Sequence, residues 1–160
     1  TPHERVRRLL HVGATPESLP CRDEQFQAVV DCTSDVLRAG AGGCAYICGV
    51  PGTGKTATVR EAVRTLQAMQ ERGHLPSFTF VEINGMKLAS PMQAYTELWC
   101  AISGDRHRLH PRAALTRLSS HFHAPAPAGR QPTVVLMDEL DLFVTSRQDV
   151  IYNMFHWPDM

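Results

Sequence analysis

Apolar residues recur three or four positions apart in several segments of the chain, which is the spacing of one face of an α-helix. This pattern predicts helices over residues 23–39, 54–73 and 90–104, a shorter helix over 113–122, and a last helix that includes 150–155. Ser90-Pro91-Met92-Gln93 has the form of a capping box with proline at the first helical position, so we expect a helix to begin there. We expect Ser146 to cap the last helix and Pro158 to stop it.

Three short apolar runs lie between these helices and predict buried strands, over Cys44–Cys48, Phe78–Ile83 and Thr133–Asp138. Strands that alternate with helices are typical of a parallel sheet covered by helices on both faces. The pattern therefore predicts an α/β fold.

Composition narrows the class of protein further. A chain of 160 residues with 43% hydrophobic and 20% charged residues is typical of one globular domain. The chain has sixteen basic and sixteen acidic residues, so its formal net charge is zero. This balance argues against a protein whose whole surface is basic and binds phosphates, but it is compatible with a small local basic site. The five cysteines are most simply interpreted as reduced thiols of an intracellular protein. No apolar run approaches the roughly 20 residues that span a bilayer, so we expect no membrane partner.

A phosphate-binding loop follows the first predicted strand. Gly49 to Thr56 reads Gly-Val-Pro-Gly-Thr-Gly-Lys-Thr, which matches G-x-x-x-x-G-K-[ST], and a predicted helix comes directly after it. The glycines allow successive backbone N–H groups to point into one concave nest, and the helix adds the positive end of its dipole. In such loops the lysine, here Lys55, contacts the β- and γ-phosphates, and the hydroxyl of Thr56 binds Mg²⁺. The sequence therefore predicts an ATP site with Mg²⁺.

An acidic pair ends the third predicted strand, at the edge of the sheet where ligands of parallel sheets bind. Asp138 is expected to hold Mg²⁺, and Glu139 to orient or deprotonate the attacking water. Kinases of small molecules activate a substrate hydroxyl and do not need a water-activating glutamate, so the pair favours a hydrolase.

Together these motifs resemble the AAA+ ATPases of the initiator clade. Within that clade the chain resembles the largest subunits of eukaryotic origin recognition complexes. The resemblance is carried by four stretches that together span most of the chain: 16–22, 49–59, 83–88, and 138–142 with 148–158. Asn84-Gly85-Met86-Lys87-Leu88 and Gln148-Asp149-Val150-Ile151-Tyr152-Asn153-Met154-Phe155 are its most specific parts, whereas residues 106–130 match poorly.

The resemblance implies a P-loop NTPase (AAA+) fold, truncated before the fourth strand and the helical lid. It implies a pre-core segment over 1–22 that contacts the adenine through Thr15, followed by a partial nucleotide-binding core over 23–160. The predicted catalytic residues are Lys55 and Glu139, and the predicted metal ligands are Thr56, Asp138 and Glu139. The predicted nucleotide-binding residues are Thr15, Gly49, Val50, Pro51, Gly52, Thr53, Gly54, Lys55, Thr56, Ala57, Asp138 and Glu139.

The resemblance also implies a function in the nucleus, where the protein would bind ATP between itself and a neighbouring subunit. It would bind replication origins in double-stranded DNA and license helicase loading together with the other subunits and a helicase-loading protein. A helix within Lys87–Gly104 would face DNA, although a lysine exposed to solvent before a helix cap explains Lys87 equally well. Neither Arg130 nor Arg147 is expected to be the arginine finger, because the family's finger follows the fourth strand.

Two alternatives remain open at the level of sequence. The helicase-loading sibling of the same clade shares the P-loop and the acidic pair, but the Asn84–Leu88 stretch argues against it. An ATP-dependent scaffold, in which hydrolysis is incidental, is compatible with the same residues. In the family's strand order 5-1-4-3-2 the fourth strand lies between the first and the third. Without it we expect either direct pairing of these two strands or exposed edges and poor solubility of the isolated piece.

Overall fold

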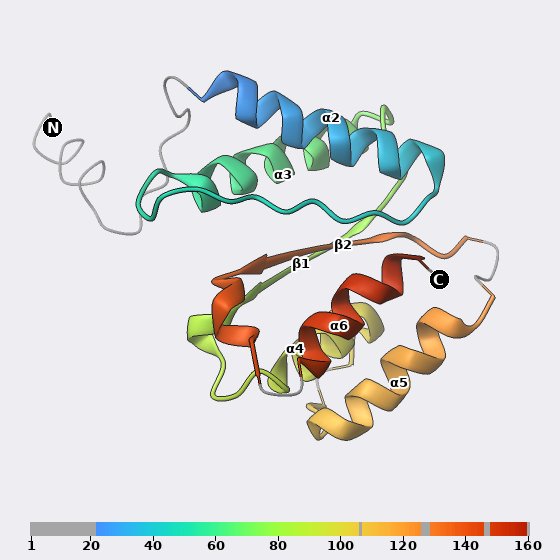
Figure 1. Ribbon diagram of the computed structural model, residues 1–160. Coiled ribbons are helices and arrows are strands. Elements are labelled where there is room, and N and C mark those ends of the chain that lie inside the picture. The colour runs from blue at the N-terminus through green and yellow to red at the C-terminus, as the bar shows by residue number, and fades with distance from the viewer. Residues whose placement is uncertain (1–21, 106, 126–128, 146–147, 160) are drawn as a thin grey trace, which may run out of the picture. The chain divides into compact units, whose positions relative to one another are not determined.

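The structure is a computed structural model, which describes residues 22–105, 107–125, 129–145 and 148–159 (Figure 1). The chain divides into two compact units. Of the described residues, the first unit holds 22–35 and 46–74, and the second holds 36–45 and 75–159. The P-loop belongs to the first unit and the acidic pair to the second.

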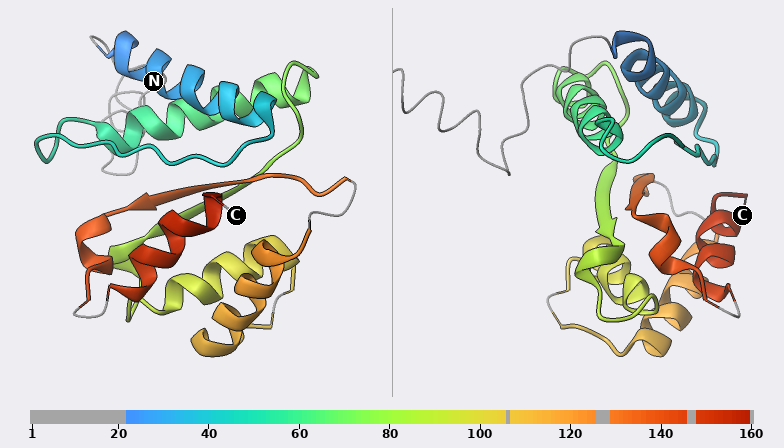
Figure 2. Two further views of the ribbon diagram at one scale, coloured as in Figure 1. Left: turned by 45° about the vertical axis from the view of Figure 1, so that its right-hand side comes forward. Right: turned by 60° about the vertical axis from the view of Figure 1, so that its left-hand side comes forward.

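The first unit contains two helices that lie side by side, α2 (Asp23–Ala39) and α3 (Lys55–Glu71) (Figures 1 and 2). Of α2, the part up to Asp35 belongs to this unit. The apolar spacing predicted both helices, and the buried side chains follow it. The buried residues of this unit are Val30, Ser34, Thr58, Val59, Ala62, Val63 and Leu66. Burial of this stripe stabilises the helix that carries the P-loop at its N-terminus.

The second unit contains a parallel sheet of two strands, β1 (Thr79–Asn84) and β2 (Thr133–Asp138). Their register pairs Thr79 with Thr133 and Asn84 with Asp138, so both strands end at the same edge. The other elements of this unit are η1 (Gly85–Lys87), α4 (Gln93–Ser103), α5 (Pro111–His123), η2 (Leu140–Phe143), α6 (Asp149–His156) and η3 (Trp157–Asp159). The predicted parallel sheet with flanking helices is confirmed.

The core of the second unit lies against one face of this sheet. Val81 and Ile83 of β1 point into it, whereas Glu82 between them is exposed, as the two-residue period of a strand requires. Helices α4, α5 and α6 supply the rest of the cluster, namely Ala94, Tyr95, Leu98, Ala114, Leu118 and Val150, together with Phe143 and Trp157.

A buried tyrosine joins two of these helices. Tyr95 of α4 is fully buried, and its hydroxyl donates to the backbone oxygen of Asp149 at 3.1 Å and accepts from Nδ2 of Asn153 at 2.8 Å. Burial raises the pKa of this hydroxyl above its ordinary value. Because both of its hydrogen bonds go to α6, Tyr95 fixes the start of the helix that follows the acidic pair.

The predicted strand over Cys44–Cys48 is wrong. These residues are in no sheet, and each of them is exposed, with Tyr46 at 72%. A strand is stabilised by hydrogen-bonded neighbours at its edges, and β1 and β2 pair with each other instead. In the strand order implied above, the neighbours of this segment are the fourth and fifth strands, and neither is among the three strands that the sequence predicts.

Two helix starts also differ from the prediction. Helix α4 begins at Gln93, because residues 90–92 form hydrogen-bonded turns rather than its first turn. The expected capping box is not formed, since the side chain of Gln93 accepts from the backbone N–H of Ala89 at 3.0 Å and no side chain caps α4. Helix α5 starts at Pro111 instead of residue 113, capped by His110. The predicted cap Ser146 lies outside the described residues.

Candidate functional site

The P-loop turns directly into α3, as its sequence predicts. Gly52 and Gly54 have φ of 77° and 82°, a backbone conformation that is strained for residues with a side chain. The loop is tied internally, because the hydroxyl of Thr53 donates to the backbone oxygen of Val50 at 2.8 Å. Gly49 to Thr53 are exposed and Gly54 to Ala57 are half-buried, so the concave backbone is accessible to a ligand.

Lys55, the first residue of α3, folds back over this loop. Its Nζ donates to the backbone oxygens of Gly49 at 2.7 Å and Val50 at 3.1 Å. The ammonium group therefore lies beside the loop backbone at the helix N-terminus, where the helix dipole and the N–H groups also favour an anion. A tetrahedral oxyanion such as a phosphate matches this combination of charge and donors.

A side chain that the sequence did not single out contacts the same loop. Arg22, just before α2, donates from Nη1 to the backbone oxygen of Thr53. The same nitrogen lies 3.4 Å from Oγ1 of Thr58, the buried threonine one turn into α3. The predicted adenine contact Thr15 lies outside the described residues.

The acidic pair occupies the carboxyl end of β2, in the second unit. Asp138 is half-buried and Glu139 is exposed. Glu139 has φ 56° and ψ 54°, a left-handed conformation that is uncommon for residues other than glycine. Its backbone N–H donates to Oδ1 of Asp138 at 3.2 Å, and its backbone oxygen accepts from Leu142 at 3.0 Å. The two acids therefore follow one another at a turn, where the first is held by the backbone of the second.

Asn84 is a second residue that sequence reasoning missed. It ends β1 directly opposite Asp138, and its Nδ2 donates to Oδ2 of that carboxylate at 3.0 Å. Its Oδ1 accepts from the backbone N–H of Met86 at 2.9 Å, which caps η1. The sequence did offer an indication of this contact. An amide residue, Asn84, ends the strand that neighbours the one ending in Asp138.

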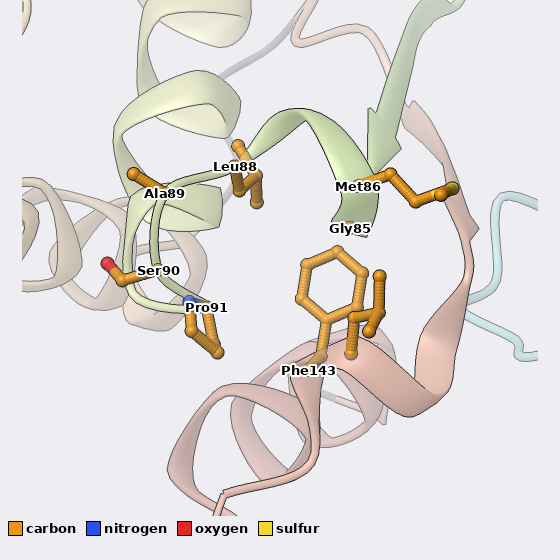
Figure 3. A pocket seen from close by; sticks show the side chains of 8 residues that line it. Gly85, Met86, Leu88, Ala89, Ser90, Pro91 and Phe143 are labelled. Carbon is orange, nitrogen blue, oxygen red and sulfur yellow. The ribbon is translucent and has the colours of Figure 1, made fainter.

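The turn that follows Asn84 packs tightly on the segment after the acidic pair. A Cβ on Gly85 would lie 2.9 Å from the backbone oxygen of Glu139 and 3.0 Å from the ring of Phe143, so this position accepts only glycine without a shift. A pocket of about 380 Å³ opens beside it (Figure 3). Its lining is Gly85, Met86, Leu88, Ala89, Ser90, Pro91, Leu142 and Phe143. No charged side chain lines it, so it does not fit a phosphate.

The donor chemistry of the described residues bears on metal binding. No group of three or more histidine, cysteine or carboxylate side chains in the described part of the chain could hold a metal ion by itself. Thr56 in the first unit offers a hydroxyl oxygen, and Asp138 and Glu139 in the second offer carboxylate oxygens. Oxygen ligands of these kinds are the ones that Mg²⁺ prefers, and it commonly takes its remaining ligands from water and phosphates. Among the described helices none is both long and apolar enough to span a bilayer.

Comparison with known proteins gives consistent results over nearly the whole chain. The sequence profile of the AAA ATPase domain family matches residues 18–159. Origin recognition complex subunit 1 of Schizosaccharomyces pombe is 44% identical over 160 residues, which is all of this chain and 22% of that protein. The Homo sapiens subunit of the same name is 44% identical over 155 residues, 97% of this chain and 18% of that protein. The chain thus spans about a fifth of the length of these relatives.

Solved structures agree with the sequence comparisons. A structure of Drosophila ORC bound to DNA aligns with a TM-score of 0.90 at 42% identity, over 99% of this chain and 40% of that one. The Aeropyrum pernix ORC1 protein in complex with DNA aligns with a TM-score of 0.73 at 24% identity, over 92% of this chain and 38% of that one, which supports the fold alone.

Proposed function

The chain belongs to the AAA ATPase domain family, and membership of this family implies nucleotide binding. We propose that the chain is part of the ATPase core of the largest subunit of an origin recognition complex. The observation that carries this proposal is 44–46% identity to such subunits from several animals and a yeast, over 97% or more of the chain. The helicase-loading sibling would not be expected to share this level of identity. We propose that residues 23–160 form the nucleotide-binding core and that residues 1–22, including Thr15, contact the adenine.

The nucleotide site is assigned to the residues predicted from the sequence. The nest over Gly49–Ala57 binds the α- and β-phosphates through backbone N–H groups, and Lys55 contacts the β- and γ-phosphates. The exposed loop glycines and the position of the Lys55 ammonium support this assignment. The described part of the chain offers no second loop of this kind.

As ligands of Mg²⁺ we propose the oxygen donors Thr56, Asp138 and Glu139, which are of the type that this ion prefers; when bound it would neutralise negative charge on the phosphates. The hydrogen bonds from Asn84 and from the backbone N–H of Glu139 hold the Asp138 carboxylate in one orientation. Glu139 then accepts a proton from the attacking water, or orients it. The reaction is hydrolysis of ATP, with the remaining positive charge supplied as an arginine finger by a neighbouring subunit.

At the level of the whole protein, we propose that it acts in the nucleus with the other origin recognition complex subunits and a helicase-loading protein. The complex binds origins in double-stranded DNA and licenses helicase loading for DNA replication. The segment from Lys87 to Gly104, which includes α4, is the part of this chain proposed to face DNA; the Lys87 side chain is exposed.

This function is tested by DNA binding of the reconstituted complex that contains the intact protein. With fluorescein-labelled duplex DNA, we expect anisotropy titrations to show binding that strengthens when ATP and Mg²⁺ are added, because the nucleotide joins neighbouring subunits. ADP at the same concentration is the matched control and should support weaker binding. Equal DNA affinity with ATP, with ADP and without nucleotide would contradict the proposed coupling of ATP to origin binding.

Replacement of Asn84 tests the support given to Asp138. Asn84→Ala removes a hydrogen bond to a carboxylate and a cap on η1, which we expect to lower the free energy of unfolding by about 1–3 kcal/mol. Asn84→Asp keeps the acceptor for Met86 but places a second negative charge beside Asp138. We therefore expect Asn84→Asp to lower ATP turnover more than Asn84→Ala does, measured as phosphate release at saturating ATP. The reverse order would show that the amide acts only through the cap.

A further inference from the structure

Arg22 contacts the backbone of the P-loop. It precedes α2, and its side chain reaches one group of the loop and one group of α3. The same nitrogen, Nη1, donates to the backbone oxygen of Thr53 and lies 3.4 Å from Oγ1 of Thr58. The contact with Thr58 is partly buried, whereas the contact with Thr53 is exposed.

The contact with Thr53 fixes the direction of a neighbouring N–H group. In a trans peptide the C=O of Thr53 and the N–H of Gly54 belong to one rigid plane and point in opposite directions. A donor that holds the oxygen of Thr53 therefore also fixes the direction of the Gly54 N–H. This constraint matters because the Thr53–Gly54 peptide is followed by Gly54, whose φ of 82° shows the wider backbone freedom of glycine, so the backbone alone does not fix this plane.

Thr58 completes the arrangement. Its hydroxyl donates to the backbone oxygen of Gly54 at 3.0 Å, and its side chain is buried. A hydroxyl has one proton to donate and lone pairs to accept, so this donation leaves Oγ1 oriented to accept from Arg22. The guanidinium, the loop carbonyl and the first turn of α3 form one connected set.

We propose that Arg22 is a positioning residue of the phosphate nest, which keeps the Thr53–Gly54 peptide oriented for the diphosphate part of a nucleotide. This proposal rests on the proposed nucleotide binding. Arg22 acts through the backbone and not by touching the phosphates, and its charge also polarises the peptide whose N–H faces the ligand.

The test is a titration of the intact protein with a fluorescent ADP analogue, with unlabelled ADP and adenosine as competitors. Arg22→Ala should raise the Kd for ADP about tenfold, the change expected for loss of one charge-assisted hydrogen bond to a binding group. Its affinity for adenosine, which has no phosphate, should stay within about twofold of the wild type. Arg22→Lys keeps a charged donor and should recover most of the ADP affinity.

Thr58→Val is the second variant, in case Arg22→Ala fails to fold. It keeps the shape of the side chain and removes the hydroxyl, which accepts from Arg22 and donates to Gly54, so we expect a loss of about threefold in ADP affinity. In the double variant Arg22→Ala/Thr58→Val the combined loss should be smaller than the sum of the two single losses, because both changes remove the contact between Arg22 and Thr58.

The results distinguish a failure of the proposed nucleotide binding from a failure of the proposed role of Arg22. A wild-type protein that does not bind ADP would overturn the proposed nucleotide function. A wild type that binds ADP, with Arg22→Ala unchanged or weakened equally for ADP and adenosine, would overturn the positioning role alone. Fully additive losses in the double variant, or failure of Arg22→Lys to restore ADP affinity, would overturn it as well.

Discussion

Replacing Lys55 by alanine is expected to abolish ATP binding, whereas Glu139→Gln should bind ATP normally and lose turnover. Lys55 lies over the loop that is proposed to hold the phosphates, where its ammonium neutralises their charge already in the ground state. Glu139 acts on water only in the chemical step, so its loss raises the barrier without weakening binding. We expect the Kd of Lys55→Ala to rise by at least about a hundredfold and the kcat of Glu139→Gln to fall by about 10²–10⁴.

The measurement is a fluorescent-nucleotide titration for binding and phosphate release for turnover, both with the intact protein. Lys87→Ala is the matched control for charge, because Lys87 is the only other lysine in the sequence and lies in the other unit. Its nucleotide affinity should equal that of the wild type. Equal loss of affinity in Lys55→Ala and Glu139→Gln would refute the division of roles.

Much of the fold could be predicted from local patterns in the sequence. Helix α2 and strand β2 have the predicted bounds, and β1 is shifted by one residue. These elements bury an apolar stripe or face against neighbours within the chain, so the pattern reports the burial that stabilises them. The parallel pairing of β1 with β2 likewise follows from the helices that separate them along the chain.

The Cys44–Cys48 segment shows the limit of this reasoning. An apolar run indicates that a segment is suited to burial, but it does not state which strands are present to pair with it. Here Tyr46 and Ile47 are 72% and 41% exposed, in the segment that leads into the P-loop. The direct pairing of this segment with the third predicted strand, one of the two expected outcomes, does not occur.

The sequence motifs of the site could be predicted, whereas the tertiary contacts that support these motifs could not. The glycine spacing of the P-loop and the pair Asp138-Glu139 are local sequence features with a clear chemical reason. Arg22 lies 31 positions from Thr53, and Asn84 lies 54 positions from Asp138, so their roles depend on tertiary structure. The left-handed backbone of Glu139 could not be predicted from a local pattern either, and the turn that follows it packs closely against Gly85.

The intact protein without its neighbouring subunits is expected to bind ATP but to hydrolyse it barely above background. An arginine finger contributes roughly 10³–10⁵ to kcat in related phosphoryl-transfer systems, and we propose that a neighbouring subunit supplies it. Neither Arg130 nor Arg147 is expected to be this finger, and Arg147 lies outside the described residues. The guanidinium of Arg130 lies 5.6 Å from the centre of the Phe122 ring, a cation–π contact within the second unit.

Adding the neighbouring subunits should therefore raise kcat by about 10³–10⁵ without a comparable change in the Kd for ATP, because a finger stabilises charge that develops in the transition state. The measurement is single-turnover ATP hydrolysis with and without the partners. Arg130→Ala is the internal control and should retain the full stimulation. If the isolated protein turned over ATP at the stimulated rate, or if Arg130→Ala removed the stimulation, the missing charge would have to come from this chain. Glu139 and Lys55 would then act with an arginine in cis, and ATP hydrolysis would not report on assembly with a neighbour.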